Sequence, residues 1–194
     1  MTDLFCVTYK KDFPYLRHSL RSVAKFCSGF NQFLIMLPED DMAAFAELLA
    51  SLKLKTKFPI NSLAYVDKPG KGMLLHMVKI VAADMYSSAE HICHIDADCV
   101  YDTPTTPEDL FIDGKPILRY EPFTSIIQRH DSMARWRDAT AACLPFNPKN
   151  ETMRAHGATF NRVTYVKSRQ MIEQKTNMRF DIYMLKGPNV FPQE

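Results

Sequence analysis

Hydrophobic segments of membrane-spanning length are missing from this sequence. No run of about 18 apolar residues, the length that suggests a transmembrane helix, occurs among its 194 positions. The opening residues, Met1 to Phe5, lack the basic segment with which a secretory signal peptide begins. Internal repeats and low-complexity segments are absent as well. We therefore expect a cytoplasmic protein with no transmembrane segment.

Paired cysteine motifs are also missing. The five cysteines form an odd set without any Cys-x-x-Cys, and they are Cys6, Cys27, Cys93, Cys99 and Cys143. We interpret them as reduced, mostly buried thiols of an intracellular protein. One stretch has the residue types of a zinc site: His91, Cys93, His94, Asp96, Asp98 and Cys99. Zinc is disfavoured there, because strand alternation divides these side chains between two faces and no Cys/His pair at zinc-finger spacing accompanies them.

What the sequence does contain is the composition of one globular domain. Its apolar fraction is 46%, and 194 residues are enough for a hydrophobic core. The net charge of +2 is unevenly distributed. Residues 1–114 carry 11 Lys and Arg against 15 Asp and Glu, a balance of −4, whereas residues 115–194 carry 13 against 7, a balance of +6. The basic excess is either scattered solvated surface or a region that binds an anionic partner.

Strands and helices alternate along the chain, which predicts an α/β fold with a mostly parallel sheet. The strand at 33–37, Phe-Leu-Ile-Met-Leu, is apolar throughout, as in a sheet that is buried on both faces. The helix at 13–27 places Leu16, Leu20 and Val23 on one face. The other predicted strands are 3–9, 62–66, 91–96, 116–120 and 158–160, and the other predicted helices are 41–52, 73–87, 131–142 and 162–176.

Two aspartates, Asp96 and Asp98, follow the apolar start of the strand at 91–96. They stand where the chain leaves the core, and ionised carboxylates held there without partners would be costly. A divalent cation is a natural partner, since Mg²⁺ and Mn²⁺ prefer hard oxygen ligands and would in turn hold a diphosphate. Asp-Ala-Asp is also an ordinary turn sequence, and that interpretation stays open.

The arrangement resembles the GT-A class of glycosyltransferases, whose Asp-x-Asp motif follows a central strand. The opening of the chain carries the same resemblance: the strand Asp3-Leu4-Phe5-Cys6-Val7-Thr8-Tyr9, then Lys10-Lys11-Asp12, then a helix that contains Ser22-Val23. It looks like the first βα unit of a small bacterial or phage-type branch of that class. The resemblance covers most of residues 3–120.

The resemblance implies a single GT-A-like domain of Rossmann type, in which a mostly parallel central sheet is flanked by helices. Residues 1–114 would form the half that binds a nucleotide sugar, and residues 115–194 would face the acceptor. The implied activity is that of a metal-dependent glycosyltransferase of hexosyltransferase type, with UDP-sugar as the expected donor and Mn²⁺ or Mg²⁺ as the cofactor.

The resemblance also implies roles for individual residues. Asp96 and Asp98 would hold the metal and the donor diphosphate, and Asp98 would take part in catalysis. Thr8, Tyr9 and Asp12 would contact the nucleoside, although Asp12 could equally cap the following helix. Lys79 would lie near the donor phosphates. His76 stands where similar proteins have Gln. Members of the class often have a histidine and a carboxylate near the end of the domain. Here His156 would be the histidine, as a further metal ligand, and Glu194 the carboxylate, as a catalytic residue.

The acceptor is expected to be anionic, because the basic excess lies in the second half. A phosphorylated or sugar-bearing lipid and an acidic glycan are the first choices, and a DNA base is the next. The expected contacts are Arg129, Arg135, Arg137 and Arg154. Two other functions stay open. A nucleotidyltransferase would normally have a glycine-rich loop after the first strand, and no glycine occurs between Val7 and Asp12. The second is a non-catalytic module that binds nucleotide sugars.

Overall fold

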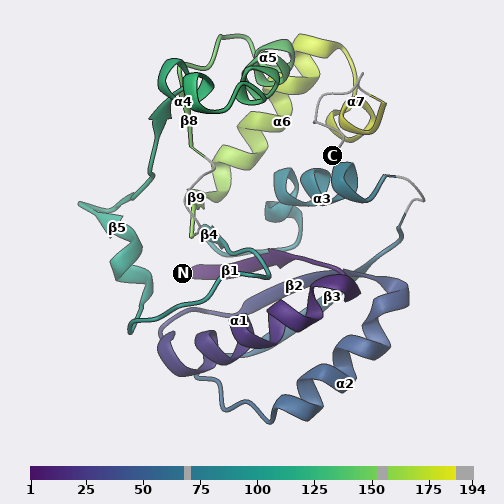
Figure 1. Cartoon of the computed structure of the whole chain (residues 1–194), viewed down its shortest axis with the longest axis vertical. Coiled ribbons are helices and arrows are strands. Elements are labelled where there is room, and N and C mark those ends of the chain that lie inside the picture. The colour runs from purple at the N-terminus through teal and green to yellow at the C-terminus, as the bar shows by residue number, and fades with distance from the viewer. Residues whose placement is uncertain (68–70, 153–156, 187–194) are drawn as a thin grey trace.

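The computed structural model describes residues 1–67, 71–152 and 157–186. A five-stranded sheet in the order β3-β2-β1-β4-β9 lies at its centre (Figure 1). The first four strands of that order are parallel, and β9 pairs with β4 in the antiparallel direction. The strands are β1 (Thr2–Val7), β2 (Phe33–Pro38), β3 (Ile60–Tyr65), β4 (His91–His94) and β9 (Thr159–Asn161). The predicted α/β class with a mostly parallel sheet is confirmed.

The strand order creates a switch point between β1 and β4. From β1 the chain moves outward to β2 and β3, and then returns to place β4 on the opposite side of β1. The chain leaves the carboxyl end of β1 toward β2 and reaches β4 only after β3, so the carboxyl ends of β1 and β4 flank this switch point. Ligands of open α/β sheets bind at such switch points.

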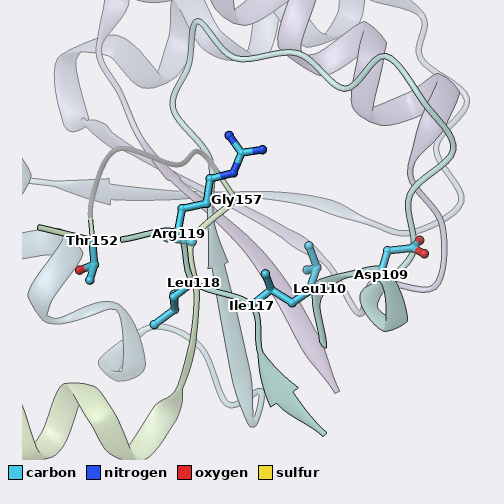
Figure 2. Close-up of a pocket in the computed structure, with 8 residues that line it drawn as sticks. Asp109, Leu110, Ile117, Leu118, Arg119, Thr152 and Gly157 are labelled. Atoms are coloured by element: carbon cyan, nitrogen blue, oxygen red, sulfur yellow. The ribbon is translucent and has the colours of Figure 1, made fainter. Parts of the chain in front are cut away.

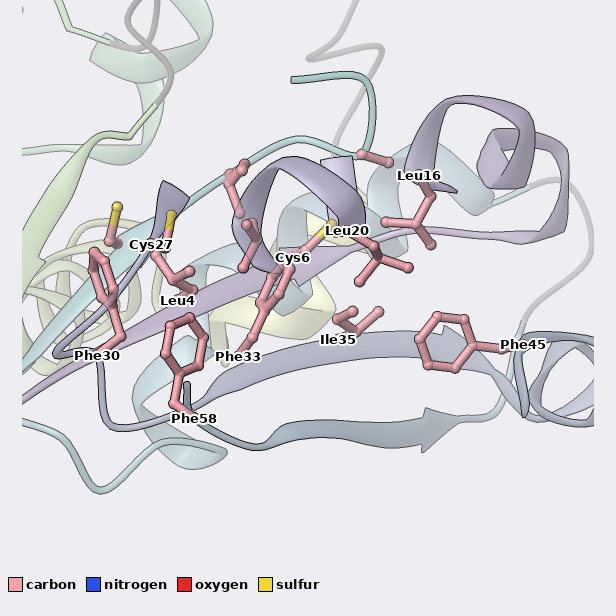
Figure 3. Close-up of a cluster of buried hydrophobic side chains, with 14 of the residues drawn as sticks. Leu4, Cys6, Leu16, Leu20, Cys27, Phe30, Phe33, Ile35, Phe45 and Phe58 are labelled. Carbon is pink, nitrogen blue, oxygen red and sulfur yellow. The ribbon is translucent and has the colours of Figure 1, made fainter. Parts of the chain in front are cut away.

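One face of the sheet is covered by α1 (Phe13–Phe26) and α2 (Met42–Leu52) (Figure 1). Helix α1 buries the residues predicted from its periodicity, Leu16, Leu20 and Val23, against the side chains that β1 and β2 point to this face (Figure 3). The predicted strand at 33–37 is buried along its whole length because the other face is covered too.

The opposite face is covered by α3 (Gly72–Val81), the short 3-10 helix η3 (Ala83–Met85) and α6 (Arg162–Thr176). A buried ion pair joins them: the Arg169 guanidinium donates to both carboxylate oxygens of Asp84 and to the carbonyl oxygen of Val81. This pair ties α6 to the end of α3. The single helix predicted at 73–87 is interrupted at Ala82, where α3 ends and η3 begins.

The second half of the chain departs most from the sequence predictions. The strand predicted at 116–120 is wrong beyond Pro116: β6 (Lys115–Pro116) pairs for two residues with β5 (Phe111–Ile112). A tight turn with positive φ at Asp113 and Gly114 joins them, and beyond Pro116 only the Ile117 amide adds a bond, to the Leu110 carbonyl oxygen at 2.9 Å. Helix α5 (Met133–Cys143) and helix α6 match predictions. Besides β5, the helices and strands of this part that were not predicted are α4 (Phe123–Arg129), α7 (Phe180–Lys186), β7 (Glu121–Pro122) and β8 (Asn150–Glu151).

Two expectations from composition can be compared with the described residues. All five cysteines are free thiols, and Cys6, Cys27 and Cys93 are buried. None of the helices in the described ranges is long and apolar enough to cross a bilayer.

Candidate functional site

The Asp-x-Asp segment forms a tight turn at the carboxyl end of β4. The Ile95 amide still donates to the carbonyl oxygen of Phe5 at 3.0 Å, so the chain follows β1 for one residue beyond the strand. The Cys99 amide then donates to the Asp96 carbonyl oxygen at 3.1 Å and closes the turn. Ala97 is buried among the residues that face α1, while Asp96 and Asp98 are exposed. Burial of the alanine between them holds both aspartates at the edge of the sheet.

The end of β1 supplies the second part of the site. Thr8 is buried, and its hydroxyl donates to a carboxylate oxygen of Asp12 at 3.2 Å. Asp12 occupies the N-cap position of α1, but its side chain makes no capping hydrogen bond. The capping interpretation is therefore wrong for this side chain, which turns back toward the strand end.

Three carboxylates, those of Asp12, Asp96 and Asp98, lie close enough to the end of β1 to influence the pKa values of groups there. The pKa of Asp12 is raised because burial removes it from water, and the negative charge of Asp98 adds to this; Thr8 and His76 oppose the shift. Burial also raises the pKa of the Cys6 thiol, and the charges of Asp96, Asp12 and Asp98 raise it further. These three carboxylates concentrate negative charge at the carboxyl end of β1.

His76 of α3 lies on the other side of these carboxylates. Burial lowers its pKa, although Asp96 and Asp12 act in the opposite direction, so its ring is neutral at pH 7. His94 is close to it, with a pKa lowered to about 4 because of burial and then of His76, and its Nε2 lies 2.6 Å from the Tyr165 hydroxyl. A neutral imidazole presents one N–H donor and one nitrogen acceptor. His76 can therefore make the two kinds of hydrogen bond that a glutamine amide would make.

Aromatic and acidic side chains gather at the ends of β1, β2 and β3. Tyr9 is 44% exposed. The pKa of Tyr65 is raised to about 12 by burial, by the charges of Asp67 and Asp41, and by Tyr9, so these residues lie near one another. Sequence analysis missed Tyr65, Asp41 and Asp67. The available signal was that each of these strands is followed by acidic residues at the carboxyl edge.

Lys79 has partners within the protein. Its ammonium group lies 5.4 Å from the ring centre of Tyr65 and 5.6 Å from that of Tyr86, and it donates to the Tyr86 hydroxyl at 3.2 Å. Lys79 and His76 lie on the same helix, α3, as predicted. The role of Lys79 toward donor phosphates stays a prediction.

The oxygen donors suit a hard divalent cation. Asp96 and Asp98 offer carboxylates at the solvent edge, and Mg²⁺ is commonly held by one or two carboxylates, with water and phosphate oxygens completing its shell. No group of three or more His, Cys, Asp and Glu side chains in the described ranges could close a metal site by itself. Cys93 is buried toward α1 and His94 is bonded to Tyr165, so the zinc alternative gains no support. His156, Arg154 and Glu194 lie outside the described residues.

Several arginines of the second half form ion pairs within the described part of the chain. Ion pairs involve Arg129 with Glu121, Arg137 with Asp138, Arg179 with Asp181, and Arg169 with Asp84. Helices α4 and α5, which carry Arg129, Arg135 and Arg137, lie at one end of the long axis of the molecule, and α2 lies at the other (Figure 1). The charge balance alone therefore does not locate an acceptor.

The architecture defines the class of fold: the protein has a GT-A-like fold. Some solved structures of glycosyltransferases are similar to the structure of this chain. Mouse xyloside xylosyltransferase 1, in its apo form, matches with a TM-score of 0.50 at 14% identity, over 95% of this chain and 81% of that chain. TarS of S. aureus matches with a TM-score of 0.35 at 16% identity, over 67% of this chain and 20% of that chain. At such identities the likeness concerns the fold alone.

Comparison of the amino-acid sequence with protein families and curated proteins identifies no relative.

Proposed function

We propose that this protein is a metal-dependent glycosyltransferase that transfers a sugar from a nucleotide-diphosphate sugar to an anionic acceptor. UDP-sugar is the proposed donor. The observation that carries the proposal is the convergence of Asp12, Asp96 and Asp98 at the switch point of a GT-A-like sheet. Three carboxylates repel a diphosphate, and a cation between them would remove this repulsion, which supports dependence on Mn²⁺ or Mg²⁺.

In this proposal Asp96 and Asp98 hold the cation, with His156 as a further ligand. A bound Mn²⁺ or Mg²⁺ would supply Lewis-acid stabilisation of the charge that develops on the departing diphosphate. Asp12 hydrogen-bonds the nucleoside, the buried Thr8 hydroxyl orients that carboxylate, and the exposed ring of Tyr9 stacks on the base. His76 serves as a neutral donor and acceptor beside the diphosphate, and Lys79 lies on the same helix.

The transfer itself is a substitution at the anomeric carbon. An acceptor oxygen forms the new bond to this carbon, and the bond from the carbon to the diphosphate oxygen breaks. The electron pair of that bond leaves with the nucleoside diphosphate, and a proton on the acceptor oxygen passes to a base. Glu194 is the carboxylate proposed for that base. Asp12, the partly buried carboxylate, is already engaged by Thr8.

The function is tested by titrating the protein with UDP in the presence and absence of Mn²⁺, followed by hydrolysis assays with the common nucleotide sugars. Release of UDP with free sugar or a glycosylated acceptor supports the proposal. Release of pyrophosphate from a nucleoside triphosphate and a sugar phosphate would instead identify a nucleotidyltransferase. Binding of UDP-sugar without any turnover would identify a binding module.

Replacing Tyr9 by alanine is expected to weaken UDP binding. If the ring stacks on the base, its loss costs about 1–3 kcal/mol, the range measured for base–aromatic stacking. Isothermal titration with UDP and Mn²⁺ measures the change. Tyr15→Ala is the matched control, since Tyr15 is also an exposed tyrosine, 61% accessible, on the neighbouring helix α1. Equal affinities of wild type and Tyr9→Ala would exclude the stacking role.

A further inference from the structure

A small pocket lies beside the end of β4, on the side away from β1 (Figure 2). Its volume is about 150 Å³, and it is lined by Asp109, Leu110, Ile117, Leu118, Arg119, Thr152, Gly157 and Ala158. Gly157 donates its amide to the His94 carbonyl oxygen at 3.0 Å, and the His94 amide donates to the Ala158 carbonyl oxygen at 3.0 Å. Because His94 stands two residues before Asp96, the pocket adjoins the candidate metal turn.

The lining combines aliphatic side chains with one basic group. Leu110, Ile117 and Leu118 provide the apolar part, and the Ile117 amide donates to the Leu110 carbonyl oxygen at 2.9 Å, which holds two of these residues side by side. Two apolar residues close along the chain to Leu110 and Arg119 are also exposed: Ile112 by 64% and Tyr120 by 68%. Isolated exposed apolar residues are ordinary, but a group of them around a pocket marks a binding surface.

Arg119 is the cation of this pocket. No ion pair joins its guanidinium to another residue within the described ranges. The one acidic residue of the lining, Asp109, is already engaged: its Oδ2 accepts hydrogen bonds from the amide of Thr106 at 2.7 Å and from the Thr106 hydroxyl at 3.0 Å. Figure 2 shows the Arg119 side chain pointing away from that of Leu118. A guanidinium without a carboxylate partner suits a phosphate, which it can bind with two parallel hydrogen bonds.

We infer that this pocket binds the acceptor, and that the acceptor is a lipid phosphate: an aliphatic chain lies against Leu110, Ile117 and Leu118, and its phosphate pairs with Arg119. The inference rests on the proposed glycosyltransferase function and names the acceptor class. The pocket is smaller than the roughly 300–1,000 Å³ of sites that enclose whole ligands. It therefore holds the phosphate and the first part of the chain, while the rest of the chain follows the exposed apolar residues outside.

This placement differs from that expected from the charge balance. Arg129 and Arg137 are paired with neighbouring carboxylates on or next to α4 and α5, far along the molecule from the sheet. Arg119 is close to the end of β4 and lies next to apolar side chains. An acidic glycan would require several polar partners, and the pocket lining offers mainly aliphatic groups.

The inference is tested with octyl phosphate as the probe, inorganic phosphate as the head group alone and octyl glucoside as the chain without charge. Titration calorimetry below the micelle concentrations is expected to give at least tenfold tighter binding of octyl phosphate than of either fragment. Arg119→Gln should weaken octyl phosphate binding about tenfold or more, and Ile117→Ser should weaken it without changing the binding of inorganic phosphate. Both residues are exposed, so the thermal midpoint should stay near that of wild type.

Arg135→Gln is the matched control, because it removes an exposed arginine of α5 and is expected to leave octyl phosphate affinity unchanged. The inference is overturned if octyl phosphate does not bind, if inorganic phosphate binds equally well, or if Arg135→Gln is the variant that loses binding. UDP and Mn²⁺ are titrated into the wild-type protein in the same series. Octyl phosphate binding through Arg119 with no UDP binding would refute the donor site and leave the phosphate pocket standing.

Discussion

Donor hydrolysis by the Asp98→Asn variant is expected to fall at least about 100-fold, while the fold stays intact. Metal ions contribute several kcal/mol to stabilising a leaving group, and each 1.4 kcal/mol is about a tenfold change in rate. Asp98 is exposed and outside the strand, so its replacement removes no core packing. The measurement is UDP release from a UDP-sugar at saturating Mn²⁺, together with the thermal midpoint of each variant.

Asp102→Asn provides the control for this experiment. Asp102 is an exposed aspartate four positions further along the same loop, so the substitution makes the same change of charge outside the proposed metal site. Its activity should match that of wild type. EDTA should abolish wild-type hydrolysis, and added Mn²⁺ should restore it. Activity of Asp98→Asn equal to wild type, or wild-type turnover that persists in EDTA, would exclude the metal assignment.

The Asp84→Asn substitution is expected to lower the free energy of unfolding by about 3–5 kcal/mol. Removing one partner of a buried ion pair leaves the other charge buried without compensation, which has a cost in this range. The Asp84 and Arg169 side chains are only 5% and 10% exposed, so solvent screens this pair little. Urea unfolding followed by circular dichroism measures the effect. Because the pair ties α6 to the end of α3, the variant should also loosen the helix that positions His76.

A surface ion pair provides the comparison. Arg179 and Asp181 form a similar bidentate contact, but the Arg179 side chain is 72% exposed. Asp181→Asn should therefore change the unfolding free energy by no more than about 1 kcal/mol. In the double variant Asp84→Leu/Arg169→Leu no charge is left buried, so it should recover part of the stability lost by Asp84→Asn. Equal effects of Asp84→Asn and Asp181→Asn would show that the buried pair contributes little to stability.

Much of the candidate site could be predicted from the sequence because of where particular residues stand along the chain. Thr8, Tyr9 and Asp12 follow the first strand, and Asp96 and Asp98 follow the fourth. The resemblance to GT-A glycosyltransferases implies that both segments face the donor, and the structure brings them to the same edge of the parallel sheet. The buried strand at 33–37 and the helix with Leu16 and Leu20 likewise carry their own local patterns.

The sequence by itself determined the α/β class, the main strands and helices of the first half, and the position of the two aspartates at a strand end. These follow from local periodicity and chain order. Only the tertiary structure brought His76 beside Asp12 and Asp96, Tyr65 beside Tyr9, and Asp84 beside Arg169, and only it formed the pocket that contains Arg119. Such contacts join residues far apart in the chain, and they depend on strand order and on how helices pack across the sheet, neither of which a local pattern contains. The same reason explains the errors in the second half, where elements of two to seven residues are stabilised by packing rather than by their own periodicity.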